Sequence, residues 1–340
     1  MRLASIKSGR DGRLVVLTPD GMRFAEVPDI AVTLREALDN WEQAAPLLAA
    51  RAAMLGGDPA QGLPVAGVQF AAPLPRASAW LDGSTFFNHI RLMNRAMGTE
   101  VKPAMLDMPL MYQGGSDDLL GPNDPILVAD AAWGIDLEAE LGVVVDDVPM
   151  GTTADQALAY VTLILLLNDV SLRNLQPREL MLGFGMLQAK PSTAFAPFAV
   201  TPDEFGKDWA DGRLNIEMRS SINGTPIGRP RASIGMVYGF AQLIEHAART
   251  RRLSAGTIIG SGTISNEQPI ETARIEEGGV GFSCLSEARA IDMIRTGAAE
   301  TSFLHYGDRV VIEAVDSLGR SLFGRIDQVV EHPAGREQAA

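Results

Sequence analysis

Three acidic residues alternate along one predicted strand of this chain. The segment Gly134–Val145 reads GIDLEAELGVVV, and because successive side chains in a strand point to opposite faces, Asp136, Glu138 and Glu140 share one face. Like charges about 7 Å apart on that face repel each other and need positive compensation. Carboxylate oxygens suit Mg²⁺, Mn²⁺ or Ca²⁺. The alternative is a solvent-facing edge strand whose acids maintain solubility.

A second candidate group follows the apolar run Tyr160–Asn168, which predicts a buried strand ending in an acid. A buried carboxylate needs a partner, because leaving it unpaired is costly. Asp169, Arg173 and Gln176 are spaced i, i+4 and i+7, which predicts one face of a helix. The alternative is an ordinary surface Asp–Arg pair at the start of a helix.

Asp82 and His89 form a third candidate pair, seven residues apart in the segment DGSTFFNH. A histidine beside an acid can act as a general base, although a single histidine is more often structural. The other three have weaker claims: His246 lies in a predicted helix, His305 beside a turn and His332 in the tail.

A glycine-rich turn, GSGTIS, occupies residues 260–265 at the end of a predicted strand. Such turns let the backbone approach a ligand closely. The turn is not a P-loop, no GxGxxG fingerprint follows a predicted strand, and GxSxG and HExxH are absent. The residues alone indicate a β-rich protein with a carboxylate metal site and do not name a reaction.

Composition excludes several classes of function. The 340 residues include 42 Asp and Glu against 29 Lys and Arg, a formal charge of −13, which disfavours nucleic acid and anionic membrane surfaces as partners. Cys284 is the single cysteine, so no internal disulfide can form, as fits a reducing cytosol. The N-terminus lacks a signal-peptide core, and the longest apolar stretch, Leu158–Leu167, is shorter than the ~20 residues that span a bilayer. We therefore expect a cytoplasmic protein.

Short β runs separated by turns dominate the chain and predict a mostly β, α+β fold. Residues 1–30 predict a small antiparallel unit, and residues 33–54 a helix that Pro46 kinks or splits. Gly56–Pro64 is a candidate connector. We expect a small N-terminal domain over 1–72, a catalytic domain over 73–330 and a flexible tail over 331–340. The clearest further strands are Leu141–Val145, Leu163–Leu167, Leu214–Arg219, Thr257–Ile264 and Arg309–Ala314. Two helices are predicted: one runs from a capping box at Thr153–Gln156 to about Tyr160, and the other covers Met236–Arg251.

In this order, the candidate segments resemble the fumarylacetoacetate hydrolase family. The matching stretches are DGSTFFNH (82–89), PLMYQGGSDD (109–118), DLEAEL (136–141), NDVSLRNLQ (168–176), QAKPST (188–193), GSGTIS (260–265) and a closing GDRV…FGRI (307–326). Each is weak alone, but the ordered set covers about residues 76–326 and is specific. The resemblance implies a β-sandwich or roll catalytic domain behind a small N-terminal domain, and a homodimer.

The resemblance also implies roles for particular residues. It assigns a divalent cation, Mg²⁺ or else Ca²⁺ or Mn²⁺, to four carboxylates: Asp82, Glu138, Glu140 and Asp169. It makes His89 the general base, oriented by a late glutamate. Among Glu276, Glu277 and Glu287 we favour Glu287, because GFSCLSE resembles the family's segment there. It gives stabilisation of the oxyanion to Arg173, Gln176 and Lys190, and substrate contact to Tyr112, to which we add Thr263 of the glycine-rich turn.

These roles predict a metal-dependent hydrolase that cleaves a carbon–carbon bond in a fumarylacetoacetate-like β-diketo acid of aromatic, tyrosine-type catabolism. The same residues would serve a decarboxylase, isomerase or hydratase on a related oxo-acid such as oxaloacetate. A non-catalytic metal-binding scaffold is a further alternative, but it would require neither His89 nor Lys190. Residues 91–108 and 177–187, the expected specificity loops, do not indicate the acyl substituent.

Overall fold

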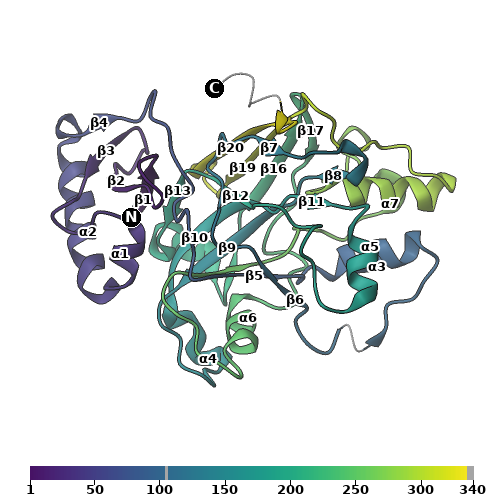
Figure 1. Ribbon diagram of the computed structural model, residues 1–340, viewed down its shortest axis with the longest axis horizontal. Helices are drawn as coiled ribbons and strands as arrows, with labels where there is room; N and C mark the ends of the chain where they lie inside the picture. The colour runs from purple at the N-terminus through teal and green to yellow at the C-terminus, as the bar shows by residue number, and fades with distance from the viewer. Residues whose placement is uncertain (104–105, 335–340) are drawn as a thin grey trace.

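Two sheets of unequal size hold most strands of residues 1–103 and 106–334, the part of the chain that the computed structural model describes (Figure 1). The larger sheet is mainly antiparallel and runs from the N-terminal residues to the candidate site. In spatial order it consists of β4 (Leu63–Pro64), β3 (Arg23–Glu26), β2 (Arg13–Leu17), β1 (Arg2–Ile6), β13 (Phe198–Val200), β10 (Val161–Asn168), β9 (Ala139–Val145), β18 (Thr257–Gly260), β5 (Ala79–Gly83) and β6 (Met111–Gly114), with β12 (Ala194–Phe195) paired to β10.

A smaller sheet packs against the middle of the larger one. Its strands are β17 (Thr225–Gly228), β16 (Glu217–Ile222), β19 (Arg309–Val315), β20 (Ser321–Glu331) and β7 (Ile126–Leu127). Two short pairs, β8 (Ile135–Asp136) with β11 (Ser171–Leu172) and β14 (Trp209–Ala210) with β15 (Arg213–Leu214), complete the described strands. The strand-rich α+β class predicted from the sequence is confirmed.

The apolar run before Asp169 forms β10, a strand that is covered on both faces. Ile164 and Leu166 pack into the core between the two sheets, while Leu163 and Leu165 pack into a second core beneath the N-terminal helices. Strands buried on both faces read as continuous apolar runs instead of alternating ones. Among the residues described, no helix is both long and apolar enough to cross a membrane.

The N-terminal residues form the predicted antiparallel β unit, covered by α1 (Leu34–Leu38) and α2 (Trp41–Gly57). Strand β1 pairs with β13, with Arg2 opposite Val200, so this unit extends the large sheet. The segment expected to be a connector ends in β4, which pairs with β3 and belongs to the same unit.

The helical break expected at Pro46 lies elsewhere. The first helix ends before Asp39, the second begins after Asn40, and Pro46 lies inside α2. Asn40 has φ −136° and ψ 40°, which interrupts helical geometry there. Pro46 is the sixth residue of α2, where it lacks one backbone hydrogen bond and its ring crowds the carbonyl of Glu42, but the helix continues through it to Gly57.

Beyond the N-terminal unit, the described residues form five further α-helices: α3 (Phe87–Ala96), α4 (Ala154–Ala157), α5 (Gln176–Leu182), α6 (Phe240–Ala247) and α7 (Leu285–Thr296). The capping box of Thr153 and Gln156 at the start of α4 is confirmed. The prediction of a helix over Met236–Arg251 is too long, because Arg213 binds the carbonyl oxygens of Met236 and Val237 and holds this segment outside α6. Helices α3, α5 and α7, which group at one end of the molecule, were not predicted from the sequence (Figure 1).

The strand predictions hold best at the centre of each sheet. Leu141–Val145, Leu163–Leu167 and Arg309–Ala314 fall within β9, β10 and β19. The run Thr257–Ile264 stops being a strand after Gly260, and Leu214–Arg219 is divided between β15 and β16. Residues 335–340 of the predicted tail lie outside the described residues.

Candidate active site

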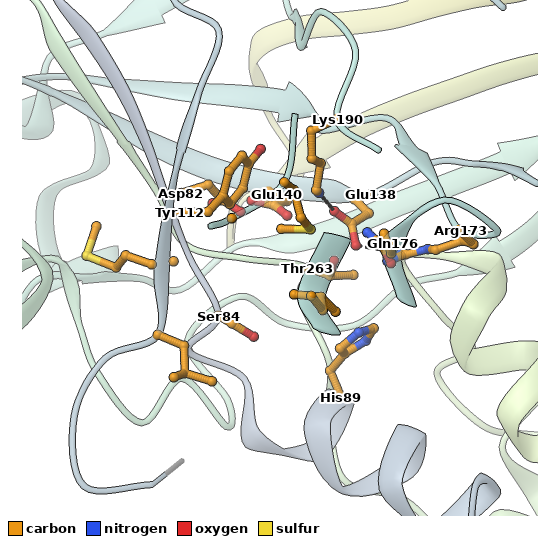
Figure 2. Close-up of a pocket in the computed structure, with 16 residues that line it drawn as sticks. Asp82, Ser84, His89, Tyr112, Glu138, Glu140, Arg173, Gln176, Lys190 and Thr263 are labelled. Carbon is orange, nitrogen blue, oxygen red and sulfur yellow. Dashed lines mark hydrogen bonds and ion pairs between the residues drawn. The ribbon is translucent and has the colours of Figure 1, made fainter. Parts of the chain in front are cut away.

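Three carboxylates converge where neighbouring strands of the large sheet end. Asp82 lies near the end of β5, Glu140 near the start of β9, and Asp169 directly after β10. One oxygen from each lies within 4.8 Å of the other two, and none of the three residues is more than 4% exposed. The sheet order therefore brings together acids that are 29 to 87 positions apart in the sequence; two of them, Asp82 and Glu140, are seen in Figure 2.

The glycine-rich turn makes room for one of these acids. Strand β18 lies between β9 and β5, and Gly260 is paired with Asp82. A Cβ atom on Gly260 would stand 2.2 Å from Asp82 Oδ1. Gly262, with φ +79°, donates its backbone N–H to the same oxygen at 3.2 Å. The close backbone approach predicted for this turn is thus made to the Asp82 carboxylate.

Burial and mutual repulsion dominate the electrostatics of this carboxylate triad, Asp82, Glu140 and Asp169. Burial, and then the charge of Asp169, raise the pKa of Asp82 well above its usual value. Burial, and then the charge of Asp82, do the same for the pKa of Glu140. Neither carboxylate oxygen of Glu140 has a hydrogen-bond partner among the described residues. An unpartnered buried acid beside two others fits an oxygen-ligated divalent cation.

Glu138 is held by two cationic side chains. Arg173 donates to Oε1 and Lys190 to Oε2, and Lys190 also donates to Asp169. Burial opposes ionisation, but Arg173 and Lys190 lower the pKa of Glu138 well below its usual range. Glu138 is not among the residues whose oxygens all lie within 4.8 Å of one another. It therefore connects the triad to the cationic part of the site.

The helix expected over Asp169–Gln176 does not form, and the alternative of a surface Asp–Arg pair is excluded as well, because Asp169 is buried and Arg173 binds other acids. Residues 171–172 form β11, and α5 begins only at Gln176. The backbone N–H of Arg173 donates to Gly134 O instead of to a carbonyl four residues earlier. Strand pairing with β8 thus overrides the helical spacing. Arg173 instead binds Glu138 and Asp136, with Nε 2.8 Å from Asp136 Oδ2, and Gln176 Oε1 accepts from Arg173 at 3.3 Å.

Asp136, the third acid of the alternating segment, connects the site to helix α7. Besides Arg173, it accepts the backbone N–H groups of Leu285 at 2.6 Å and Ser286 at 3.0 Å. These are the first two residues of α7, whose N-terminal N–H groups lack partners within the helix. Asp136 is therefore a helix-capping and arginine-orienting residue.

We expect Asp136→Ala to lower the free energy of unfolding by about 3 kcal/mol, because it removes one partner of a buried ion pair and of two backbone donors. Denaturant unfolding measures the change. Asp117→Ala, at an exposed carboxylate, is the control and is expected to change stability by less than about 0.5 kcal/mol. A loss for Asp136→Ala no larger than that of the control contradicts the assignment.

Helix α3 brings His89 to helix α7. His89 Nδ1 lies 2.9 Å from Glu287 Oε1, and Glu287 is only 2% exposed. The other late glutamates lie on the surface. Glu277 is paired with Arg295, whose hydrogen bond lowers the pKa of Glu277 to about 2. The structure thus places Glu287, of the three candidates, against His89.

A cavity of about 430 Å³ unites these groups (Figure 2). Of the residues singled out from the sequence, those that line it are Asp82, His89, Tyr112, Glu138, Glu140, Arg173, Gln176, Lys190 and Thr263. Asp169 lies behind this layer, where it accepts from Tyr112 Oη and Thr193 Oγ1, both at 2.7 Å. Glu287 lies behind His89.

Five further side chains of the cavity wall were not predicted: Ser84, Leu110, Met111, Leu180 and Met186. Two sequence signals were available. Leu110 and Met111 directly precede Tyr112, and Leu180 lies one helical turn after Gln176. Spacing alone does not show which apolar residues face a cavity and which face the core.

Comparison with protein families matches the whole of this architecture. Residues 78–331 match the family described as fumarylacetoacetate (FAA) hydrolase C-terminal. Residues 1–76 match the family described as fumarylacetoacetase N-terminal domain 2. The first match covers all the residues of the candidate site.

Individual relatives are similar over much of the chain. A 2,4-didehydro-3-deoxy-L-rhamnonate hydrolase from Sphingomonas sp. is 28% identical over 62% of this chain, which spans 66% of that relative, just under two thirds. The human mitochondrial oxaloacetate tautomerase FAHD2A is 25% identical over 69% of this chain and 70% of its own length. The crystal structure of maleylpyruvate hydrolase from Sphingobium sp. SYK-6, in complex with manganese(II) and pyruvate, has a TM-score of 0.62 and 16% identity, and covers 98% of this chain and 99% of its own. The chain belongs to the fumarylacetoacetate hydrolase family, which includes both hydrolases and isomerases.

Proposed function

We propose that this protein is a divalent-metal-dependent hydrolase that cleaves a carbon–carbon bond in a fumarylacetoacetate-like β-diketo acid of aromatic, tyrosine-type catabolism. The observation that carries the proposal is the His89–Glu287 pair, with Nδ1 2.9 Å from Oε1, because His89 lines the same cavity as Asp82 and Glu140 of the carboxylate triad. A histidine oriented by a buried carboxylate is the usual arrangement for activating water. The hydrolase named among the relatives supports the proposal.

The carboxylate triad, with Glu138 as a fourth ligand, holds the cation in this proposal. The hard oxygen donors favour Mg²⁺, Ca²⁺ or Mn²⁺, and the manganese(II) in the Sphingobium structure supports a divalent ion. When bound, such a cation polarises the carbonyl oxygens of a diketo acid as a Lewis acid.

His89 then acts as the general base. Its Nδ1 hydrogen is donated to Glu287, which leaves Nε2 free to accept a proton. A water molecule gives that proton to Nε2 and attacks the substrate carbonyl carbon, forming an alkoxide. Lys190 and Arg173, with Gln176 beside them, supply hydrogen-bond donors for the developing charge.

Collapse of the alkoxide completes the reaction. The carbonyl re-forms as a carboxylic acid, and the electron pair of the broken carbon–carbon bond passes to the leaving enolate. The imidazolium of His89 returns the proton to that enolate carbon. Water is thus consumed, and the products are one carboxylic acid and one shorter keto acid.

Tautomerisation, decarboxylation or hydration of an oxo-acid such as oxaloacetate is the second candidate. Enolate formation is common to these reactions and to hydrolysis, so the same charged residues would serve them. The similarity to human oxaloacetate tautomerase FAHD2A favours keeping this alternative.

A turnover assay with Mg²⁺ separates these candidates. Among fumarylacetoacetate and acylpyruvates, we expect the best substrate to be cleaved with a kcat/KM at least about tenfold above that for enolisation or decarboxylation of oxaloacetate, because the His89–Glu287 pair activates water. Loss of diketone absorbance reports the first reaction, and enol absorbance and pyruvate formation report the others. Efficient turnover of oxaloacetate without diketone cleavage would replace the hydrolase proposal with the alternative.

We further propose, from the resemblance to the family, that the protein is a homodimer that acts on a small-molecule substrate. From its acidic composition, its single cysteine and its short apolar stretches, we propose that it works in the cytoplasm without nucleic acid or membrane partners. Size-exclusion chromatography with light scattering measures the oligomeric state.

A further inference from the structure

The catalytic cavity has a charged floor and an apolar rim. The carboxylates and cations of the floor are all nearly buried, with Lys190 and Arg173 side chains 5% and 11% exposed. The rim carries four apolar side chains: Leu110 and Met111 before Tyr112, and Leu180 and Met186 on and after α5. Leu180 is 61% exposed. The rim is therefore where a substrate's tail would leave the charged part of the site.

Both cations that line the cavity are already paired on the floor. Arg173 binds Asp136 and Glu138, and Lys190 binds Glu138 and Asp169. Of the other polar side chains in the lining, Ser84, Tyr112 and Thr263 carry hydroxyl groups and Gln176 a neutral amide, while His89 is engaged with Glu287. Among the described residues that line the cavity, none on the rim offers a positive charge.

The charge of the floor adds a second reason against an anionic tail. Five acidic side chains, those of Asp82, Asp136, Glu138, Glu140 and Asp169, lie on or directly behind the floor, and the two cationic side chains already bind three of them. A substrate carboxylate at the rim would lose water of hydration against apolar side chains without gaining a cationic partner.

We infer that the substrate is a β-diketo acid whose acyl tail is uncharged and apolar, and that Leu110, Met111, Leu180 and Met186 select that tail. This inference rests on the proposed function and deepens it. It favours acylpyruvates with hydrocarbon tails over diacids such as fumarylacetoacetate. Apolar walls with a few placed polar groups are the usual basis of such discrimination.

The test compares two substrates that differ in the charge of the tail and by one methyl group: succinylpyruvate and its methyl ester at the distal carboxylate. With the Mg²⁺-loaded enzyme we expect kcat/KM to be at least about tenfold higher for the ester, because it removes the desolvated charge. Equal values, or a preference for the diacid, would overturn the inference.

Leu180→Arg tests the rim directly, and the same helix offers a matched control. Leu180 and Leu182 are each 61% exposed, but only Leu180 lines the cavity. Leu180→Arg is expected to lower the ester-to-diacid ratio of kcat/KM at least about tenfold by supplying a partner for the carboxylate. Leu182→Arg should leave the ratio within twofold. Equal shifts in both variants would mean that the rim is not the tail site.

Binding measurements separate this inference from the proposed hydrolysis. If neither compound is cleaved, the hydrolase proposal fails, and isothermal titration of the Mg²⁺-loaded protein with each compound still tests the rim. Tighter binding of the ester, reversed in Leu180→Arg, upholds the inference without hydrolysis. Equal or weaker binding of the ester rejects it whatever the reaction.

Discussion

His89→Ala is expected to lower kcat for diketo-acid hydrolysis by about 10³-fold and to leave divalent-cation affinity within twofold of wild type. The imidazole lies against Glu287 and lines the cavity, but it is not part of the carboxylate triad. Its removal therefore abolishes the base without removing a proposed ligand of the cation. Steady-state kinetics gives the first quantity, and calorimetric titration with Mg²⁺ or Mn²⁺ gives the second.

The control for this experiment is His246→Ala. His246 lies on α6, outside the catalytic cavity, and is partly buried like His89. We expect it to retain activity within twofold. If His89→Ala lost cation binding together with turnover, His89 would belong to the metal site, and the assignment of water activation to the His89–Glu287 pair would be wrong.

Glu140→Gln is expected to abolish cation binding and to lower kcat by about 10³-fold or more, because the Lewis acid contributes several kcal/mol to the reaction. Both Glu140 oxygens lack hydrogen-bond partners among the described residues and face the other acids of the triad. An amide keeps the shape of the side chain but removes the charge that would hold the ion. Glu138→Ala should lose metal and activity together as well.

The thermal stability of Glu140→Gln distinguishes a metal site from a cluster of acids with a structural role. Without a cation, Glu140→Gln relieves repulsion among buried carboxylates, so the variant is expected to melt at a higher temperature than wild type in the presence of a chelator. With Mg²⁺ present the order should reverse, because only wild type gains stability from binding. Thermal denaturation in the two conditions measures both effects.

Glu277→Gln is the matched control. Its carboxylate is paired with Arg295 on the surface and does not line the cavity, so cation-dependent stabilisation should persist in this variant. Full wild-type activity in a strong chelator would refute the metal proposal altogether, whatever the behaviour of the variants.

The acids of the alternating segment were identified from their types and spacing, which are local properties, whereas the roles of Lys190 and Glu287 came from the resemblance to the family. Alternation along Gly134–Val145 placed three acids on one predicted face, and all three are buried in the structure. Their tasks differ, however. Asp136 caps α7, Glu138 binds Arg173 and Lys190, and Glu140 faces the other triad acids. The strand is interrupted between β8 and β9, at Leu137–Glu138, and what stands opposite each acid depends on segments far along the chain.

Predictions from local spacing failed where pairing between distant strands was stronger. The i, i+4, i+7 pattern of Asp169, Arg173 and Gln176 predicted a helix, but pairing between β11 and β8 takes up the backbone hydrogen bonds of that segment. Helix propensity is a weak preference that such contacts readily override. Helices α3 and α7 were missed although they position His89 and Glu287.

The sequence by itself determined the inventory of this site: four carboxylates, a histidine, cationic partners and a glycine-rich turn, in an order typical of one family. Only the tertiary structure decided which glutamate meets His89, 198 positions away, which cations hold Glu138, and which apolar side chains form the rim. Residue type and alternation are set within a few neighbouring residues, whereas these contacts arise from sheet order and helix packing, which join distant segments through a shared core.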